Sequence, residues 1–222
     1  MESYENFIRF LNSKKDICIV GKGITSQNYD EKEYDLYIGV KQSILLLKQK
    51  DILVMNDFEG VFGCEDIFKE LKYIVCPYYP HLRTLPNPNL TYKSIQTYAK
   101  KCGFKGKIVI YNNNIKNIII PKLLNVMTFT SGDIIFNFLN LCSNKKNMNI
   151  ELYGIGVSNI DNPLIIELML KNHKKNKVNE MYNEYLMRRY TKPTGDNTNR
   201  KSNLKRVRDR ITIFEDLNIT FN

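Results

Sequence analysis

The sequence predicts an α/β protein: a single Rossmann-like, doubly wound and mainly parallel sheet with helices on both faces and a basic C-terminal extension. Two observations support this prediction. Short apolar runs rich in β-branched residues recur along the chain, as is typical of strands buried on both faces. Stretches with helical periodicity or turn residues separate these runs, which is the pattern of strands joined by helical crossovers.

The expected elements can be placed along the chain. An amphipathic helix over Tyr4–Leu11 precedes a first strand at Ile17–Val20. Further strands are expected at Tyr34–Val40, Asp51–Asn56, Tyr73–Cys76, Lys107–Tyr111 and Asn149–Gly156. Helical stretches are expected at Ser43–Leu47, Ile67–Leu71, Tyr92–Lys101, Ile134–Cys142 and Leu164–Leu170, followed by a basic helix over His173–Arg189. The mildly apolar end, Ile211–Phe221, could dock back on the core.

Length and charge suggest two parts. We expect a nucleotide-binding α/β domain over residues 1–170 and a basic helical segment and tail over 171–222, which would form a lid or the acceptor side. Of the net charge of +10, residues 171–210 contribute +9, from 13 Lys or Arg and four Asp or Glu. Such a segment attracts nucleic acid, phosphates or an anionic membrane surface, although a solvated helix face with a tail explains the charge equally well.

The cellular location is predicted from what the sequence lacks. No apolar run approaches the roughly 20 residues of a membrane span. The first residues carry acidic side chains and no apolar core, so we expect no signal peptide. The five cysteines are scattered without a Cys-x-x-Cys pair, as expected of reduced, mostly buried thiols. These features predict an intracellular protein, either cytoplasmic or bound peripherally to a membrane.

Polar residues cluster where the expected strands end. The first strand runs into Gly21-Lys22-Gly23, where glycines let the backbone turn sharply and Lys22 places a cation where a phosphate would lie. Lys41 and the pair Asn56-Asp57 follow later strands, and Asp57 is a candidate for a ribose or acid–base contact. The stretch Thr130-Ser131-Gly132 precedes an expected helix, so its hydroxyl and amide groups could bind an anion. The carboxyl ends of parallel strands share one edge, where ligands bind.

The order of these motifs resembles the sialyltransferases, particularly the short bacterial enzymes and more distantly the eukaryotic family. The resemblance spans roughly residues 17–180 and implies a glycosyltransferase that takes its sugar from a nucleotide-activated, CMP-linked donor. It implies that the glycine turn, Asn56 and the Thr-Ser-Gly turn bind the donor, and that His173 is the general base that deprotonates the acceptor hydroxyl. The motifs are Gly-x-Gly-x-x-Ser (Gly21, Gly23, Ser26), a strand ending in Asn56, Thr-Ser-Gly (Thr130, Ser131, Gly132), a strand ending in Tyr-Gly (Tyr153, Gly154), and His173 followed by Glu180.

The chain also departs from the family pattern. Lys22 and Lys41 stand where the family usually has Asn, and the usual Arg near the Thr-Ser-Gly turn is missing. Ammonium groups at these positions would bind phosphates more strongly or select a different nucleotide. The sequence also lacks the Asp-x-Asp spacing of metal-dependent sugar transferases, so we expect an inverting, metal-independent transfer to a glycan or other hydroxyl acceptor, with no cofactor beyond the nucleotide-sugar.

Two other functions remain open. The chain could be a non-catalytic nucleotide or nucleic-acid binding protein that uses its basic C-terminal segment. It could also be a nucleotide-processing enzyme such as a diphosphokinase, although the acidic cluster that would hold magnesium for such a reaction is not evident.

Overall fold

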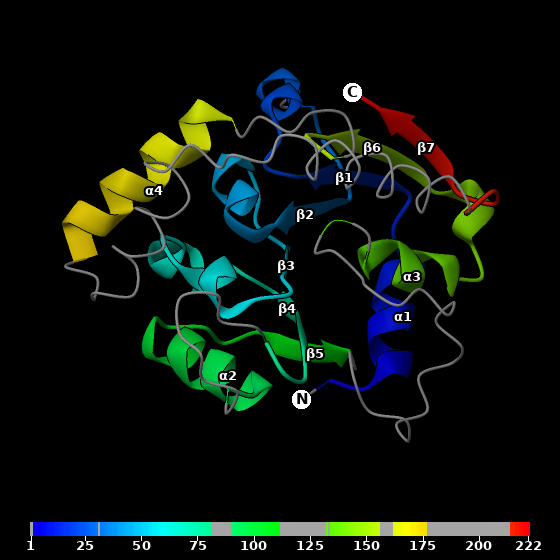
Figure 1. The fold of residues 1–222 in the computed structure, drawn as a ribbon. Helices are drawn as coiled ribbons and strands as arrows, with labels where there is room; N and C mark the ends of the chain where they lie inside the picture. The colour runs from blue at the N-terminus through cyan, green and yellow to red at the C-terminus, as the bar shows by residue number, and fades with distance from the viewer. Residues whose placement is uncertain are drawn as a thin grey trace, which may run out of the picture.

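One sheet of seven parallel strands runs through the computed structural model, in the order β5-β4-β3-β2-β1-β6-β7 (Figure 1). The structure describes residues 2–30, 32–80, 90–111, 132, 134–155, 162–176 and 214–222. The predicted α/β class with a doubly wound parallel sheet is confirmed. The strands are β1 (Asp16–Val20), β2 (Leu36–Val40), β3 (Ile52–Val54), β4 (Tyr73–Pro77), β5 (Lys107–Tyr111), β6 (Asn149–Tyr153) and β7 (Asn218–Phe221).

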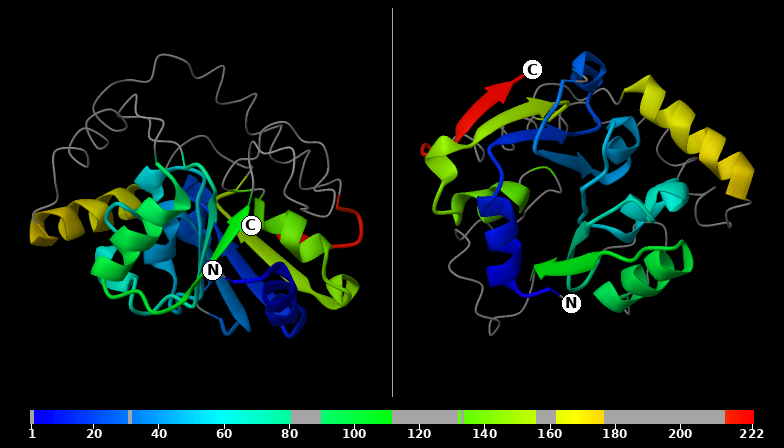
Figure 2. Two further views of the ribbon diagram at one scale, coloured as in Figure 1. Left: turned by 90° about the horizontal axis from the view of Figure 1, so that it is seen from below. Right: turned by 180° about the vertical axis from the view of Figure 1, so that it is seen from behind.

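The strand order reverses next to β1. Strands β1 to β5 follow one another outward in sequence order, and the chain then returns to place β6 on the free side of β1. The carboxyl ends of β1 and β6 therefore flank the point of reversal, where open parallel sheets most often bind ligands. The chain termini lie at opposite edges of the sheet, near β5 and at β7 (Figures 1 and 2).

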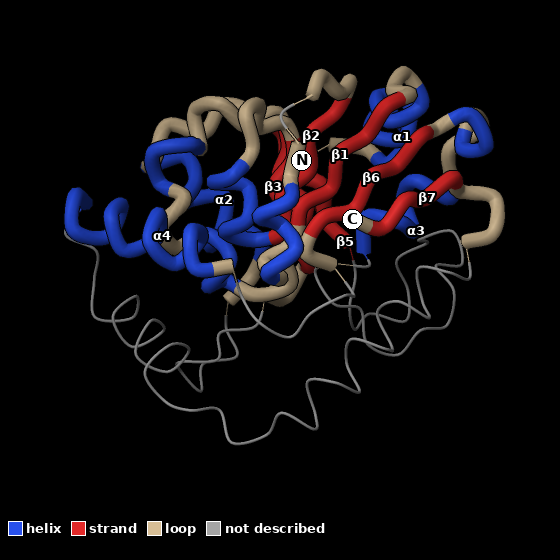
Figure 3. Tube along the Cα trace, turned by 90° about the horizontal axis from the view of Figure 1, so that it is seen from above, coloured by secondary structure: helices blue, strands red, loops and turns tan. Residues whose placement is uncertain are grey.

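Helical segments cover both faces of the sheet because strands β1 to β4 are apolar on both sides. Figure 3 shows α2 (Tyr92–Lys101) and α4 (Pro163–Asn176) on one side of the strands, and α1 (Tyr4–Asn12) and α3 (Ile134–Asn140) on the other. The face with α2 and α4 also carries 3₁₀ turns. The 3₁₀ segments of the chain are η1 (Ile24–Asn28), η2 (Lys41–Leu46), η3 (Phe58–Val61), η4 (Glu65–Ile67) and η5 (Lys145–Asn147).

Helix α1 shows how the sequence produces one of these layers. The Ser3 hydroxyl caps the helix by accepting a hydrogen bond from the Asn6 amide at 3.3 Å. Phe7 and Leu11, one turn apart, are fully buried on the apolar face that the sequence predicts. The Phe7 ring lies 5.1 Å from Tyr73 of β4 and 5.3 Å from Phe138 of α3, measured between ring centroids. The helix therefore joins the sheet to α3.

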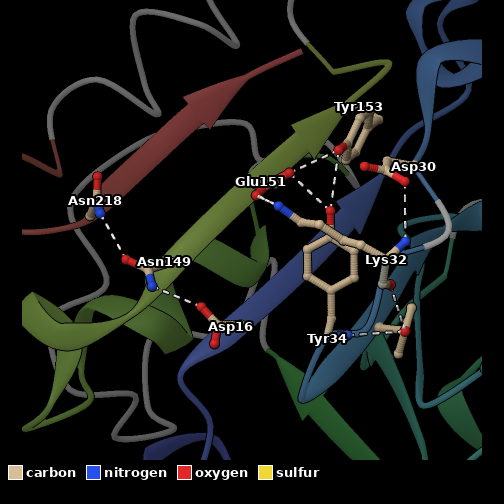
Figure 4. A network of polar contacts seen from close by, with 9 residues as sticks. Asp16, Asp30, Lys32, Tyr34, Asn149, Glu151, Tyr153 and Asn218 are labelled. Atoms are coloured by element: carbon tan, nitrogen blue, oxygen red, sulfur yellow. Dashed lines mark hydrogen bonds and ion pairs between the residues drawn. The ribbon is translucent and has the colours of Figure 1, made fainter.

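The end of the chain docks back on the core, as the sequence suggests for Ile211–Phe221. The expected boundary after residue 170 falls inside α4, and residues 218–221 form β7 of the same sheet. A ladder of side chains holds β7 in register: Asn149 Nδ2 donates to Asp16 Oδ1 (2.7 Å), and Asn218 Nδ2 donates to Asn149 Oδ1 (2.9 Å) (Figure 4). Residues 177–213, which include most of the predicted basic extension, lie outside the described residues.

The cysteines are free, as the sequence predicts. Four of them are buried and Cys102 is half-buried. Burial raises the pKa of the Cys18 and Cys76 thiols, and raises that of Cys142 to about 12, so these groups stay protonated near neutral pH. None of the helices in the described part of the chain is both long and apolar enough to cross a membrane.

Candidate functional site

The glycine turn after β1 packs directly against the turn after β6. The Gly21 amide donates to the Tyr153 carbonyl at 2.7 Å, and the Gly23 amide donates to the Gly154 carbonyl at 3.0 Å. A Cβ atom on Gly21 would lie 2.4 Å from Ile155 Cγ1 and 2.5 Å from the Gly154 oxygen. The two glycines therefore serve a contact inside the protein, and these two amides, which the sequence assigns to the donor, already have partners.

Gly154 is the other half of this contact. Its φ angle of +66° lies in the left-handed region, which favours glycine. A Cβ atom there would lie 2.8 Å from both the Gly21 and Gly23 carbonyl oxygens. Its amide donates a hydrogen bond to the Thr25 hydroxyl at 3.0 Å. Gly154 thus packs tightly against the turn after β1, at the edge between β1 and β6.

Ser26 and the start of α4 extend the same internal contact. Ser26 is buried, and its hydroxyl accepts a hydrogen bond from Asn162 Nδ2 at 2.9 Å. The Asn162 carboxamide oxygen also caps α4, accepting from the Leu164 amide at 3.0 Å, while the Asn162 amide donates to the Lys22 carbonyl at 2.8 Å. The sequence carried a signal for this cap, because Asn followed by Pro is typical of a helix start. Ser26 therefore links the glycine turn to the start of α4, and its contact with a donor stays a prediction.

Lys41 is the most unusual residue at this edge. It directly follows β2 and has a φ of +57°, the one positive φ of a non-glycine residue in the described part of the chain. Such a conformation costs about 1–3 kcal/mol and tends to occur at functional sites. Its ammonium group forms an ion pair with Asp57, and the side chains are 17% and 5% exposed, respectively. The structure thus joins the predicted site residues Lys41 and Asp57 across the ends of β2 and β3.

Lys22 and Asn56 complete the polar edge. The Lys22 side chain is half-buried, and its positive charge partly offsets the rise that burial and Glu65 cause in the pKa of the Cys64 thiol. The Lys22 ammonium group is therefore close enough to Cys64, in the segment after β3, to interact with it electrostatically. The Asn56 carboxamide oxygen accepts a hydrogen bond from the Tyr111 hydroxyl at the end of β5. Four predicted residues, Lys22, Lys41, Asn56 and Asp57, thus lie along the carboxyl ends of β1, β2 and β3.

Two neighbouring residues outside the predicted site, Gln42 and Ser43, support this edge. The Ser43 hydroxyl donates toward the Val20 and Val40 carbonyls and accepts from the Val40 amide, so it ties the ends of β1 and β2 together. The Gln42 side chain is fully buried and donates to the Glu59 carbonyl at 2.6 Å. Together they fix the backbone on both sides of Lys41. Only their place directly after a predicted strand could have indicated this.

Tyr153 points away from the polar edge. Its hydroxyl donates to Glu151 Oε2 at 2.8 Å, and the Tyr34 hydroxyl donates to the same oxygen at 2.9 Å (Figure 4). Lys32 forms an ion pair with the other carboxylate oxygen. Although partial burial acts in the opposite direction, the hydrogen bonds from Lys32, Tyr153 and Tyr34 hold the pKa of Glu151 below its usual value. Tyr153 is therefore part of a network inside the fold.

The side chains of the other predicted site residues are outside the described part of the structure, apart from Gly132, which has none. Thr130 and Ser131 lie outside the described residues, and Gly132 forms a turn two residues before α3. His173 lies in α4, and its side chain is outside the description. The preceding residue, Asn172, donates to the Gly63 carbonyl at 2.7 Å, so this part of α4 runs beside the segment after β3.

We compared the chain with protein-family models, curated proteins and solved structures. No protein-family model, curated protein or solved structure matches this chain. Within the described residues, no group of three or more His, Cys, Asp or Glu side chains is placed to hold a metal ion.

The contact between the two turns gives a first prediction. Gly154→Ala combines a strained φ with close approach to two carbonyl oxygens, whereas Gly103→Ala adds a methyl group at a φ of +87° with only Lys69 Cβ nearby, at 3.8 Å. We expect Gly103→Ala to lower the free energy of unfolding by about 1 kcal/mol. Gly154→Ala should lower it by roughly 1–3 kcal/mol more because of the clash. Urea denaturation measures both, and equal losses would contradict the packing argument.

The Glu151 network gives a prediction about pH. Because the native pKa of Glu151 lies below its ordinary value of 4.5, its charged form stabilises the fold above that pH, and this stabilisation is lost as the pH falls through the native pKa. Lys32 is 47% exposed, so solvent screening limits the effect to at most about 1 kcal/mol. Glu151→Gln should therefore destabilise the protein near neutral pH, and the difference from the wild type should shrink below about pH 4.

Urea unfolding of both proteins at the two pH values measures this difference. Glu33→Gln is the matched control, because the Glu33 carboxylate is 81% exposed and pairs only with an exposed lysine side chain, Lys48, among the ion pairs of the described residues. A Glu151→Gln deficit that persists unchanged into acid would contradict the role of the charge.

Proposed function

We propose that this chain is an inverting glycosyltransferase that takes a sugar from a nucleotide-activated, CMP-linked donor and transfers it to an acceptor hydroxyl. The observation that carries the proposal is the pair of cations, Lys22 and Lys41, at the carboxyl ends of neighbouring strands, with Asn56 and Asp57 beside them. Adjacent strands lie about 4.8 Å apart, so the backbones that carry the two lysines are close enough for both long side chains to extend to one phosphate. The order of sequence motifs, which resembles that of sialyltransferases, supplies the choice of donor.

Transfer of the sugar requires stabilisation of the negative charge that develops on the leaving nucleotide. The acceptor oxygen forms a bond to the anomeric carbon while the bond from that carbon to the phosphate oxygen breaks, and the nucleotide leaves with the electron pair. Positive groups held in place where this charge develops lower the barrier to the reaction. Lys22 and Lys41 take this role in the proposal. The conformation of Lys41 is held by the backbone that Ser43 and Gln42 fix, so the charge is positioned before the donor binds.

The acceptor hydroxyl loses its proton to a base, which the proposal assigns to His173. A histidine is the simplest base near neutral pH. The start of α4 is bonded to the glycine turn through Asn162, and Asn172 contacts Gly63 in the segment after β3. The helix thus runs along the polar edge, which supports this assignment. The proposal assigns no role to a metal ion, because the sequence lacks the Asp-x-Asp spacing.

A second function is favoured by charge alone. The net charge of +9 on residues 171–210 suits a protein that binds nucleic acid or nucleotides without catalysis. The two functions differ in what stabilises the fold. A ligand that binds only the native state raises stability, so a nucleotide site would respond to mononucleotides. A nucleic-acid binder would respond to polynucleotides, with an effect that falls steeply with salt.

Binding of the nucleotide is tested with Lys41→Met. We expect CMP to raise the melting temperature of the wild type and to have a much smaller effect on the variant, because the phosphate loses one of its cations. Lys48→Met is the matched control, since Lys48 is 51% exposed, lies two residues after η2 and forms its ion pair with Glu33. Stabilisation by nucleic acid alone, with no response to CMP, would instead support the second function.

Catalysis is tested with His173→Ala. The proposal expects turnover of a CMP-linked sugar to fall by at least about a hundredfold, because general-base catalysis contributes that much or more. CMP affinity should be retained, since the histidine acts on the acceptor. The release of CMP measures turnover and calorimetry measures affinity. Unchanged turnover would remove His173 from the mechanism, and loss of both properties would assign it to the structure.

A further inference from the structure

Three tyrosines gather immediately beyond the carboxyl end of β4. The ring centroids of Tyr78 and Tyr79 lie 4.7 Å apart, and those of Tyr78 and Tyr92 lie 5.3 Å apart. We call these three residues the tyrosine cluster. Tyr79 is 39% exposed and is the only exposed aromatic residue in the described part of the chain, whereas Tyr78 and Tyr92 are half-buried beneath it.

Main-chain hydrogen bonds hold the cluster in place. The Tyr78 amide donates to the Tyr111 carbonyl at 2.9 Å, and the Tyr92 amide donates to the Tyr78 carbonyl at 2.8 Å. Tyr92 is the first residue of α2, directly after the Thr91 cap. The cluster is thus anchored to a strand end and a helix start. Since the Tyr78 ring packs against Tyr79 and restrains it, presenting the Tyr79 ring to a ligand costs little conformational entropy.

The cluster lies on the same edge as the proposed phosphate site. Strand β4 is the neighbour of β3, which ends just before Asn56 and Asp57. Tyr111 connects the two places, because its carbonyl bonds to Tyr78 and its hydroxyl bonds to Asn56. Two strand spacings, about 10 Å, separate the end of β2 from the end of β4. A phosphate at Lys41 would therefore have the tyrosine cluster within the reach of an extended small molecule.

The three parts of a nucleotide match the order of the groups along these strand ends. In a nucleoside monophosphate the ribose separates the phosphate from a flat, aromatic base. With the phosphate at the end of β2, the ribose hydroxyls would lie over Asn56 and Asp57 at the end of β3, and the base would lie over β4. The opposite direction, across β6, is closed by the contact of Gly154 with Gly21 and Gly23.

From this arrangement we propose that the tyrosine cluster is the base subsite of the nucleotide, with the base stacked on the exposed ring of Tyr79. The inference rests on the proposed function and adds the direction in which the nucleotide lies across the strand ends. Stacking of a base on an aromatic side chain contributes binding energy without requiring a particular base. The cluster therefore supplies affinity, and any choice among bases comes from other contacts.

The test compares two probes on three proteins. Cytidine 5′-monophosphate carries the base and ribose 5-phosphate lacks it, and calorimetry measures the affinity of the wild type, Tyr79→Ala and Tyr79→Phe for each. We expect the wild type to bind the nucleotide on the order of tenfold more tightly than ribose 5-phosphate. Tyr79→Ala should lose most of this difference, while Tyr79→Phe, which keeps the ring, should retain it. Affinity for ribose 5-phosphate should be the same for all three proteins.

The outcomes distinguish an error in the base subsite from an error in the proposed function. If the wild type binds the nucleotide and Tyr79→Ala binds it equally well, the base lies elsewhere and only the subsite assignment is wrong. An equal loss of affinity for both probes would show a structural effect of the substitution and would also reject stacking. If the wild type binds neither probe, both the subsite and the proposed nucleotide site are wrong. Because Tyr79 is exposed, both variants should melt within a few degrees of the wild type.

Discussion

The structure depends on the close contact between the turn after β1 and the turn after β6. The two strands are far apart in sequence, and residues 112–148 lie between β5 and β6. Backbone hydrogen bonds from Gly21 and Gly23 to the Tyr153 and Gly154 carbonyls fix how the two strand ends meet. None of these three glycines has room for a Cβ atom. The close approach of the two strand ends at the point of reversal therefore depends on the absence of side chains at these glycines.

This contact also decides which part of the sheet edge can take a ligand. In many α/β folds a ligand enters the crevice where the strand order reverses. Here that place holds main-chain atoms of Gly154 and the side chain of Ile155. The polar groups that remain lie along the ends of β1, β2 and β3, with the tyrosine cluster beyond β4. The proposed nucleotide therefore lies to one side of the reversal point rather than across it.

The same glycines show what the sequence could and could not predict. Apolar runs located β1 to β6, and the bounds of α2 and β5 agree with the structure, because local periodicity and caps determine them. The short strand β7 was not predicted as a strand, since its pairing depends on a side-chain ladder from Asp16 through Asn149. The sequence predicted Gly21 and Gly23 as a phosphate turn but not their packing against Gly154, because close approach to a ligand and close approach to another turn both require glycine. The φ of Lys41 left no local signal either.

The ion pair between Lys41 and Asp57 bears on how a transferase at this edge would work. The Asp57 carboxylate holds the Lys41 ammonium group in place, and both side chains have little exposure. The same carboxylate opposes a bound phosphate, because two negative groups then compete for one ammonium. A site of this kind binds the nucleotide less tightly than two unpaired lysines would. The leaving nucleotide must depart after each transfer, so moderate affinity favours turnover where product release limits the rate.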